Sequence, residues 1–287
     1  MILVSLGCSS ATTTTTTDQP TTTTAPWKQV WSDNFNGPAS SGVNGSTWKY
    51  DVGQGIFGTN EVETITSATG NVHLDGQGNL DIVAINQNSA WTSGRIKTKQ
   101  LFEAPAGGEM MVTASIKQPD PANGLGYWPG FWMLGSGHWP TDGEIDILED
   151  VNGLNKEAGT LHCGNLTQRN SDGTYGPCHE GTGVGSGLQD CANCQQGFQT
   201  YTVIIDRRNE SSQQIRWYLN GHQFFSVSES AVGASVWEPA VDNSFTILLD
   251  VAIGGSYPNT QCQCGTPTSQ TSSLGTMVIR YVSVYTN

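Results

Sequence analysis

Residues 139–150, WPTDGEIDILED, alternate acidic with apolar side chains. Two-residue alternation is typical of a β-strand, so we expect Glu144 and Asp146 on one face of such a strand. Glu149 follows Asp146 by three positions, and in a regular strand its side chain would point to the opposite face. A β-bulge between Asp146 and Glu149 would add one residue and place all three carboxyl groups on the same face.

The bulge would also set the distance between the two glutamates. They would behave as if four positions apart, about 13 Å along the strand. Each side chain can lean about 4 Å toward the other, which leaves the two carboxyl groups about 5 to 6 Å apart. Retaining glycosidases use a separation of about 5–5.5 Å, because one carboxylate attacks the sugar while the other transfers a proton. Inverting enzymes need a wider gap that admits water.

The third acid, Asp146, would lie between the two glutamates. Three carboxyl groups so close together cannot all ionise cheaply, so one stays protonated near neutral pH, as a general acid requires. Asp146 can share a proton with the attacking carboxylate and orient it. A solvated acidic edge strand is the alternative interpretation. Ile145, Ile147 and Leu148 argue against it, because they need a core behind the strand.

The chain from residue 27 onward consists of short apolar segments interrupted by Gly, Asn, Asp and Pro. They predict β-strands at residues 79–85, 108–118, 200–206, 214–221, 244–255 and 276–285. A short helix is expected at most at residues 228–237. Many evenly spaced antiparallel strands predict an all-β sandwich or barrel. DGQGNLD, from Asp75, resembles a calcium loop, but it lacks the distal bidentate Glu and favours a hairpin turn.

The composition favours one domain that binds a neutral ligand. The chain has 287 residues, 36% of them hydrophobic, which is enough for a single core over residues 27–287. The formal net charge is -13, with 12 Lys plus Arg, so nucleic acid and anionic membrane surfaces are not expected as partners. Abundant Trp, Tyr, Asn, Thr and Gly suit a hydroxyl-rich polysaccharide.

Residues 1–26 are interpreted as an export segment and a linker. MILVSLGC is a short apolar run without a basic n-region, and the Thr-rich segment after it has no means of packing. Lipid attachment at Cys8 is one hypothesis, because Gly7 precedes it, although Ser5 stands where a lipoprotein signal usually has Leu. No stretch of about 20 apolar residues occurs, so we expect no transmembrane span and a secreted, extracellular protein.

The cysteines other than Cys8 form three local groups, which are Cys163 with Cys178, Cys191 with Cys194, and Cys262 with Cys264. Redox or zinc chemistry is an alternative for the CANC sequence of the second group, but structural disulfides are favoured in an exported protein. Disulfides are predicted for the first two groups. The third would close a very tight ring and is left unassigned.

Aromatic residues gather just before the acids, in GYWPGFWMLGSGHW at residues 126–139. The faces of Trp and Tyr stack on sugar rings, while polar neighbours bind hydroxyl groups. Trp128, Trp132 and Trp139 are therefore candidate substrate-binding residues. The core of a sandwich is the alternative place for each of them, and for Trp132 both interpretations stay open. Tyr127 and Phe131 belong to the same aromatic group.

GEIDILE, preceded by WPGFWMLG, resembles glycoside hydrolase family 16, the laminarinase and β-glucanase family, in its bulged E-x-D-x-x-E form. The resemblance runs from about Trp27 to Tyr285, through WSDNFNG, SGRIKTK, TLHCG, IRWYLNG and DVAIGGSYP. It implies a β-jelly-roll sandwich with an open concave cleft that cuts β-linked glucan or galactan chains internally, with retention of configuration. It also implies Glu144 as nucleophile, Asp146 as its helper and Glu149 as acid/base.

The resemblance adds four candidate substrate-binding residues. Arg95 in SGR matches a cleft arginine, with a surface ion pair as the alternative. His162 in TLHCG matches a cleft histidine, with a core histidine as the alternative. Asn60 and Glu61 lie in TNEVE, where β-1,3-glucanases contact a sugar on the donor side. Glu63 replaces an amide residue of those enzymes, and the cysteine-bearing insertion after TLHCG is absent from plain laminarinases, so β-1,3-galactan remains an alternative substrate.

The sequence therefore predicts a secreted, monomeric, retaining endo-β-glycanase for laminarin-type or mixed-linkage β-glucan, with endo-β-1,3-galactanase activity as the alternative. A non-catalytic, lectin-like carbohydrate-binding protein is the alternative of another class. It would predict a damaged acid set, whereas all three acids are present. No cofactor is expected for catalysis. Many members of the family hold a structural calcium ion on the convex side, but the sequence does not identify its ligands.

Overall fold

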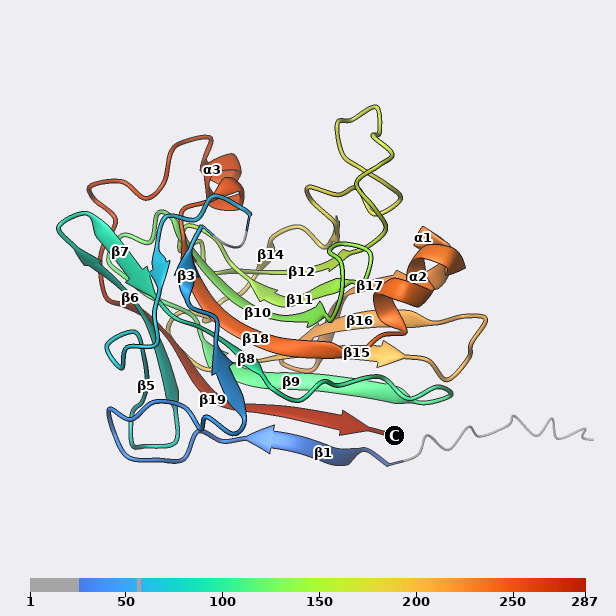
Figure 1. Ribbon diagram of the computed structural model, residues 1–287, viewed down its shortest axis with the longest axis horizontal. Helices are drawn as coiled ribbons and strands as arrows, with labels where there is room; N and C mark the ends of the chain where they lie inside the picture. The colour runs from blue at the N-terminus through green and yellow to red at the C-terminus, as the bar shows by residue number, and fades with distance from the viewer. Residues whose placement is uncertain (1–25, 56–57) are drawn as a thin grey trace, which may run out of the picture.

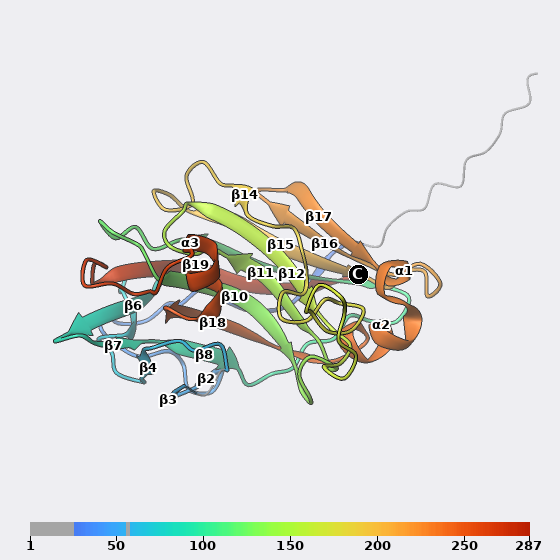
Figure 2. The ribbon, with the colours of Figure 1, turned by 90° about the horizontal axis from the view of Figure 1, so that it is seen from above.

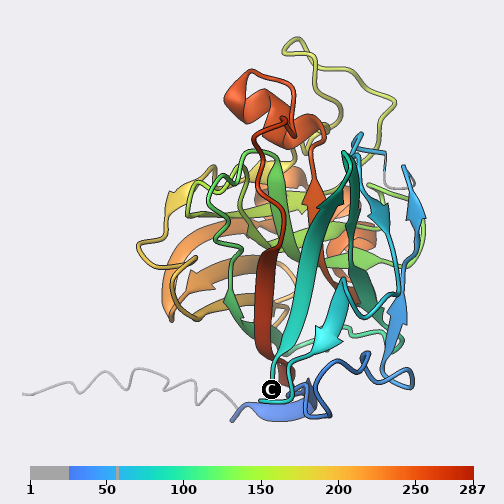
Figure 3. The same ribbon diagram turned by 90° about the vertical axis from the view of Figure 1, so that its left-hand side faces the viewer.

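The computed structural model describes residues 26–55 and 58–287, and two β-sheets stacked face to face make up most of it (Figures 1 and 3). The predicted all-β sandwich is confirmed. The export segment, the Thr-rich linker and Cys8 lie outside the described residues, apart from Pro26. In the described part of the chain, no helix combines the length and the apolar character that crossing a membrane requires.

The larger sheet has eleven strands. They are β1 (Lys28–Asp33), β3 (Gly53–Gln54), β4 (Thr64–Ile65), β5 (Val72–Leu74), β6 (Leu80–Gln87), β7 (Ala90–Ser93), β9 (Glu109–Lys117), β15 (Gln199–Asp206), β16 (Gln214–Leu219), β17 (His222–Ser228) and β19 (Gly275–Thr286). Their order is β17-β16-β15-β9-β19-β6-β7-β4-β3, with β1 paired to β19 and β5 paired to β6.

The smaller sheet has eight strands and carries the acidic segment. They are β2 (Trp48–Tyr50), β8 (Arg95–Thr98), β10 (Tyr127–Gly135), β11 (Glu144–Glu149), β12 (Lys156–His162), β13 (Val184–Gly185), β14 (Gln189–Asp190) and β18 (Phe245–Ile253). Their order is β13-β12-β11-β10-β18-β8-β2, with β14 paired to β12. β11 is therefore a central strand, which excludes the edge-strand interpretation of its acids.

The strand predictions are confirmed to within two residues at each end for β6, β9, β15, β16, β18 and β19. The turn after Asp75 joins the antiparallel strands β5 and β6, so the hairpin interpretation is also confirmed. Residues 228–237 contain the short helix α1 (Glu229–Val232) and the start of α2 (Ala234–Val241). A third helix, α3 (Ser256–Cys262), was not predicted, because its one buried residue, Pro258, gives no helical periodicity.

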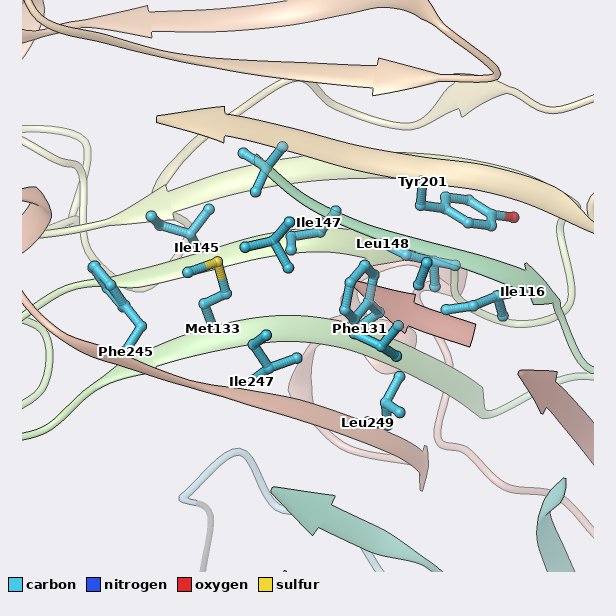
Figure 4. Packing of buried hydrophobic residues seen from close by; sticks show 14 of the residues in the cluster. Ile116, Phe131, Met133, Ile145, Ile147, Leu148, Tyr201, Phe245, Ile247 and Leu249 are labelled. Atoms are coloured by element: carbon cyan, nitrogen blue, oxygen red, sulfur yellow. The ribbon is translucent and has the colours of Figure 1, made fainter. Parts of the chain in front are cut away.

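Apolar side chains of both sheets fill the space between them (Figure 4). Ile145, Ile147 and Leu148 of β11 are fully buried there, close to Phe131 of β10 and Tyr201 of β15. Burying such side chains contributes roughly 1.5–3 kcal/mol each. The apolar residues of the acidic segment thus anchor β11 to the core, and its acids are left for the other face.

Each of the three local cysteine groups forms a disulfide, with Cα–Cα distances of 5.5, 5.6 and 5.2 Å. These values lie in the ordinary range for disulfides. The two predicted pairings are confirmed, and the unassigned third group, Cys262 with Cys264, is paired as well. The loop that carries the first pair rises above the smaller sheet, on the same side as α3 (Figures 1 and 2).

Candidate active site

The predicted bulge is present in β11. Asp146 pairs with Thr160 of β12 and Glu149 pairs with Ala158, so three residue steps on β11 match two on β12. The pairing with β10 shifts at the same place. As a result Glu144, Asp146 and Glu149 all line one cleft, while the apolar residues between them face the core.

Trp217 of β16 supports the bulge from the larger sheet. Its indole Nε1 donates a hydrogen bond to the backbone carbonyl of Asp146, at 2.7 Å, in the buried space between the sheets. Gly159 of β12 makes room for the indole, since a Cβ atom there would lie 2.4 Å from Trp217 Cδ1. The position of the catalytic strand therefore depends on both sheets.

The cleft has a volume of about 410 Å³ and lies over β10, β11 and β18. Besides the three acids, its lining includes five of the predicted substrate-binding residues, which are Glu61, Arg95, Trp128, Trp132 and Trp139. Trp139 is the most open of the tryptophans, with 45% of its surface exposed. These five predicted residues and the three acids therefore line the same cleft.

Glu149 has the surroundings of a proton donor. Trp128 Nε1 donates to its Oε1 at 2.9 Å, and Thr160 Oγ1 lies 3.5 Å from its Oε2. Burial raises the pKa of Glu149 to about 7, against the lowering effect of the Trp128 hydrogen bond. A carboxyl group with this pKa keeps its proton for much of the time at neutral pH, as general-acid catalysis requires.

Glu144 and Asp146 share a histidine neighbour. The His162 Nε2 atom lies 3.9 Å from Glu144 Oε1 and 3.5 Å from Asp146 Oδ2. Burial raises the pKa of Glu144, and the positive charges of His162 and Arg95 oppose that rise. Burial and the neighbouring glutamates raise the pKa of Asp146 well above its usual value. Asp146 therefore favours its protonated form more strongly than Glu144, whose ionisation the charges of His162 and Arg95 support.

His162 touches the acids from behind the cleft lining. Its Nδ1 lies 2.8 Å from Oε2 of Glu180, a buried residue of the loop after β12. Burial alone would lower the pKa of His162, but the hydrogen bond with Glu180 and the charges of Asp146 and Glu144 raise it to about 10. Glu180 could not be predicted from the sequence, because it lies in an irregular loop 18 positions from its partner.

Arg95 and Trp132 form the opposite wall of the cleft. The guanidinium carbon of Arg95 lies 4.6 Å from the centre of the Trp132 ring, and Arg95 also pairs with Asp51 (Nε to Oδ2, 3.4 Å). Trp132 Nε1 donates to Asp250 Oδ1 at 2.7 Å. Burial raises the pKa of Asp250 to about 6. Arg95 is 7% exposed, so the ion pair predicted as its alternative exists but is buried in the wall.

Several sequence candidates lie elsewhere. Tyr127 and Phe131 are buried in the core. Asn60 is exposed beside the wall residue Glu61, and the sugar contact predicted for it stays a prediction. Glu63 is buried, and its Oε2 accepts a hydrogen bond from the backbone N–H of Ile253 at 2.9 Å.

Asp250 and Tyr257 were not predicted from the sequence. Asp250 lines the cleft from β18, and Tyr257 of α3 packs edge-on against the lining residue Trp128, with the ring centres 5.6 Å apart. Asp250 lies in the apolar strand DVAIGG, and Tyr257 lies in the helix that had no periodic pattern. In each case only the folded chain brings the side chain to the site.

One ligand-type atom from each of Glu144, Asp146 and His162 lies within 4.8 Å of the others. The pKa of His162 is raised to about 10, so both ring nitrogens carry protons at neutral pH, whereas a metal-binding histidine offers an unprotonated nitrogen. We therefore interpret this cluster as a set of groups that share protons. The expected structural calcium ion stays a prediction without assigned ligands.

Comparisons with known proteins identify the family and the fold of the chain. The family model "XgeA-like, catalytic GH16 domain" matches residues 62–278. The crystal structure of an endo-1,3-beta-glucanase from Streptomyces sioyaensis is 41% identical, with a TM-score of 0.83, covering 91% of this chain and 98% of that one. Its similarity confirms the predicted jelly-roll sandwich.

Curated relatives differ in overall length. The chain is 28% identical to the clotting factor G alpha subunit of Tachypleus tridentatus over 90% of its own length but only 34% of that protein. It is 26% identical to a beta-glucanase of Rhodothermus marinus, over 90% of its own length and 85% of the relative. The shared part is therefore the domain that carries the cleft.

Proposed function

Because the chain belongs to glycoside hydrolase family 16, we propose that it is an endo-β-1,3-glucanase that cuts laminarin-type or mixed-linkage β-glucan with retention of configuration. The observation that carries the proposal is the bulged strand β11, which turns Glu144, Asp146 and Glu149 into one cleft. The Streptomyces sioyaensis enzyme supports the choice of substrate, since it is 41% identical over nearly its whole length.

In the proposed reaction Glu144 attacks the anomeric carbon of the bound sugar, and Glu149 donates its proton to the oxygen of the leaving chain. The C–O bond breaks and a glycosyl ester forms on Glu144. Glu149, now ionised, takes a proton from water, whose oxygen attacks the anomeric carbon and releases Glu144. The surroundings support these roles, because Glu149 has a pKa of about 7 and Glu144 faces the charges of His162 and Arg95.

The walls of the cleft suit a neutral sugar chain. Trp128, Trp132 and Trp139 offer aromatic faces for pyranose rings, and Glu61 and Asp250 offer oxygens that accept hydrogen bonds from hydroxyl groups. A cleft that lies across several strands can hold consecutive sugar units, which supports cleavage within a chain.

The structure bears on the β-1,3-galactan alternative through Glu63. This residue departs from the β-1,3-glucanase pattern, but its carboxyl group is buried and bonds to the backbone of Ile253. A substitution in the core gives little reason for a different sugar preference. The insertion after β12 remains the feature that favours galactan, because it rises above the smaller sheet, which carries the cleft (Figure 1).

The test measures the reducing ends released from laminarin, lichenan and a debranched β-1,3-galactan, with Glu144→Ala as the inactive control. We expect cleavage of laminarin or lichenan into oligosaccharides. Cleavage of the galactan alone would establish the alternative activity. Binding of a β-glycan without any cleavage would establish the lectin-like protein and contradict the enzyme.

We also infer that the protein is exported and acts as a monomer. Three disulfides in the domain require an oxidising compartment during folding. Recovery of the folded protein with free thiols from the cytosol would contradict export. Light scattering measures the mass of the protein in solution and so tests whether it is a monomer.

A further inference from the structure

Glu180 is a buried acid in a loop whose residues are mostly exposed or half-buried. The loop follows β12 and is closed by the disulfide between Cys163 and Cys178. Tyr175 and Glu180 pair through their backbones, with N–O distances of 2.9 and 2.6 Å. The side chain of Glu180 is turned inward, and the residue is only 1% exposed.

Both carboxyl oxygens of Glu180 take part in hydrogen bonds. Oε1 accepts a hydrogen bond from the backbone N–H of Cys163 at 2.8 Å, and Oε2 lies 2.8 Å from Nδ1 of His162. The first bond fixes the carboxyl group against the end of β12. The second fixes the plane and the orientation of the imidazole ring.

The other edge of the ring faces the catalytic strand. His162 Nε2 lies 3.5 Å from Asp146 Oδ2 and 3.9 Å from Glu144 Oε1. The titratable groups around the ring are therefore Glu144 and Asp146 on β11, with Glu149 farther along that strand, and Glu180 on the loop. The indole of Trp139 covers the ring at 5.7 Å between ring centres.

We propose that Glu180 is a positioning residue that keeps His162 protonated and directs its Nε2–H toward Asp146 and Glu144. The inference rests on the proposed function, since it assigns the inserted loop a role in the same reaction. An imidazolium at this place favours the ionised form of Glu144, which must attack the sugar, and leaves the proton to Glu149. The carboxylate behind the ring fixes its charge and orientation, as in other carboxylate–histidine pairs.

The variant Glu180→Gln tests the role with little change in shape. A carboxamide has one oxygen and one NH₂ group, so it can accept from Cys163 or from His162 but not from both. The loop also offers a matched control. Asp172 and His179 form a similar pair (Nδ1 to Oδ2, 3.2 Å), but their side chains are about half exposed, so Asp172→Asn changes a pair that the proposal does not use.

The first measurement determines the protonation state of His162 across the pH range by NMR of ¹⁵N-labelled histidine. In the wild-type protein we expect both ring nitrogens to carry protons at about pH 8, because the pKa of His162 is about 10. In Glu180→Gln we expect the ring to lose its proton at a pH lower by about one unit or more. A neutral His162 ring in the wild-type protein at about pH 8 would overturn the proposal even if the variant does not fold.

The second measurement is kcat and KM on laminarin as a function of pH. We expect Glu180→Gln to lower kcat by about tenfold or more across the pH range, with KM changed less than about twofold. Asp172→Asn should match the wild type. A folded Glu180→Gln variant with wild-type kcat across the pH range would contradict the role.

The two measurements separate failure of this proposal from failure of the proposed function. A wild-type protein that cuts no β-glycan would refute the enzyme, whereas the NMR titration would still report whether Glu180 holds the proton of His162.

Discussion

The hydrogen bond from Trp128 to Glu149 shows how a single neighbouring residue affects the protonation of a buried acid. The indole N–H favours the ionised form of Glu149, while burial favours the protonated form and wins, giving a pKa of about 7. Glu144 is also buried but faces the charges of His162 and Arg95. In the proposed mechanism the same residue type therefore serves as proton donor in one place and as nucleophile in the other.

Trp128→Phe tests this balance. The phenylalanine keeps an aromatic wall but removes the N–H donor, so the pKa of Glu149 should rise. Since Glu149 must be protonated to act as an acid, the alkaline limb of kcat/KM should move to higher pH by about one unit. Trp139→Phe, which changes a tryptophan of the same cleft away from Glu149, serves as the control. An unchanged or lowered alkaline limb in Trp128→Phe would argue against Glu149 as the acid.

Substitution of the acids should give a graded loss of activity. We expect Glu144→Ala and Glu149→Ala to lower kcat by at least about a thousandfold without unfolding the protein, because each removes a group that reacts with the substrate. Asp146→Asn should slow turnover less, since it removes only a proton-sharing neighbour. Circular dichroism checks the fold of each variant. Near-normal activity of Glu144→Ala would rule out its assignment as nucleophile.

At the scale of elements, the bulge in β11 is the feature on which the site depends. The sequence predicted it, because the spacing of two and then three residues between acids fits one face only with an extra residue. The strands were predictable for the same reason, since alternation is a local signal. The support from Trp217, the proximity of Glu180 and the helix α3 were not, because they depend on tertiary contacts that no short segment encodes.

Trp217→Phe probes the support of the bulge. It leaves the buried carbonyl of Asp146 without its donor, which costs about 1–3 kcal/mol of folding stability. It should also lower kcat, because the bulge positions Glu149. Trp237→Phe is the matched control, since its indole is also buried but bonds to Gln213 in another part of the sandwich. Chemical denaturation and kcat are measured for both. If the two variants lose the same stability and have the same kcat, Trp217 has no special role in positioning the site.

At the scale of the whole molecule, the sandwich buries carboxyl groups outside the catalytic set. Burial raises the pKa of Glu63 to about 8, that of Asp150 to about 7, and that of Glu157 well above its usual value. Each group holds a proton in the folded protein at a pH where the unfolded chain has released it. Stability is therefore greatest below the unfolded pKa and falls as pH rises through the folded pKa.

Glu63→Gln tests this pH dependence. For wild-type Glu63 the window runs from the ordinary value of 4.5 to about 8, and in it stability falls by up to about 1.4 kcal/mol for each pH unit. The glutamine keeps an oxygen for the N–H of Ile253 but has no proton to lose. The Tm of the variant should therefore fall less between pH 5 and 8 than the Tm of the wild type. The exposed Glu210→Gln variant should follow the wild type. Parallel curves for Glu63→Gln and wild type would contradict the buried, protonated state of Glu63.

In the proposed mechanism a single irregularity in one strand brings two glutamates to the same sugar linkage. The most direct test follows the hydrolysis of a laminarin oligosaccharide by ¹H NMR and records which anomer of the new reducing end appears first. A covalent intermediate on Glu144 predicts the β-anomer, followed by slow conversion to the α-anomer. Initial release of the α-anomer would mean direct attack by water and would contradict the proposed site.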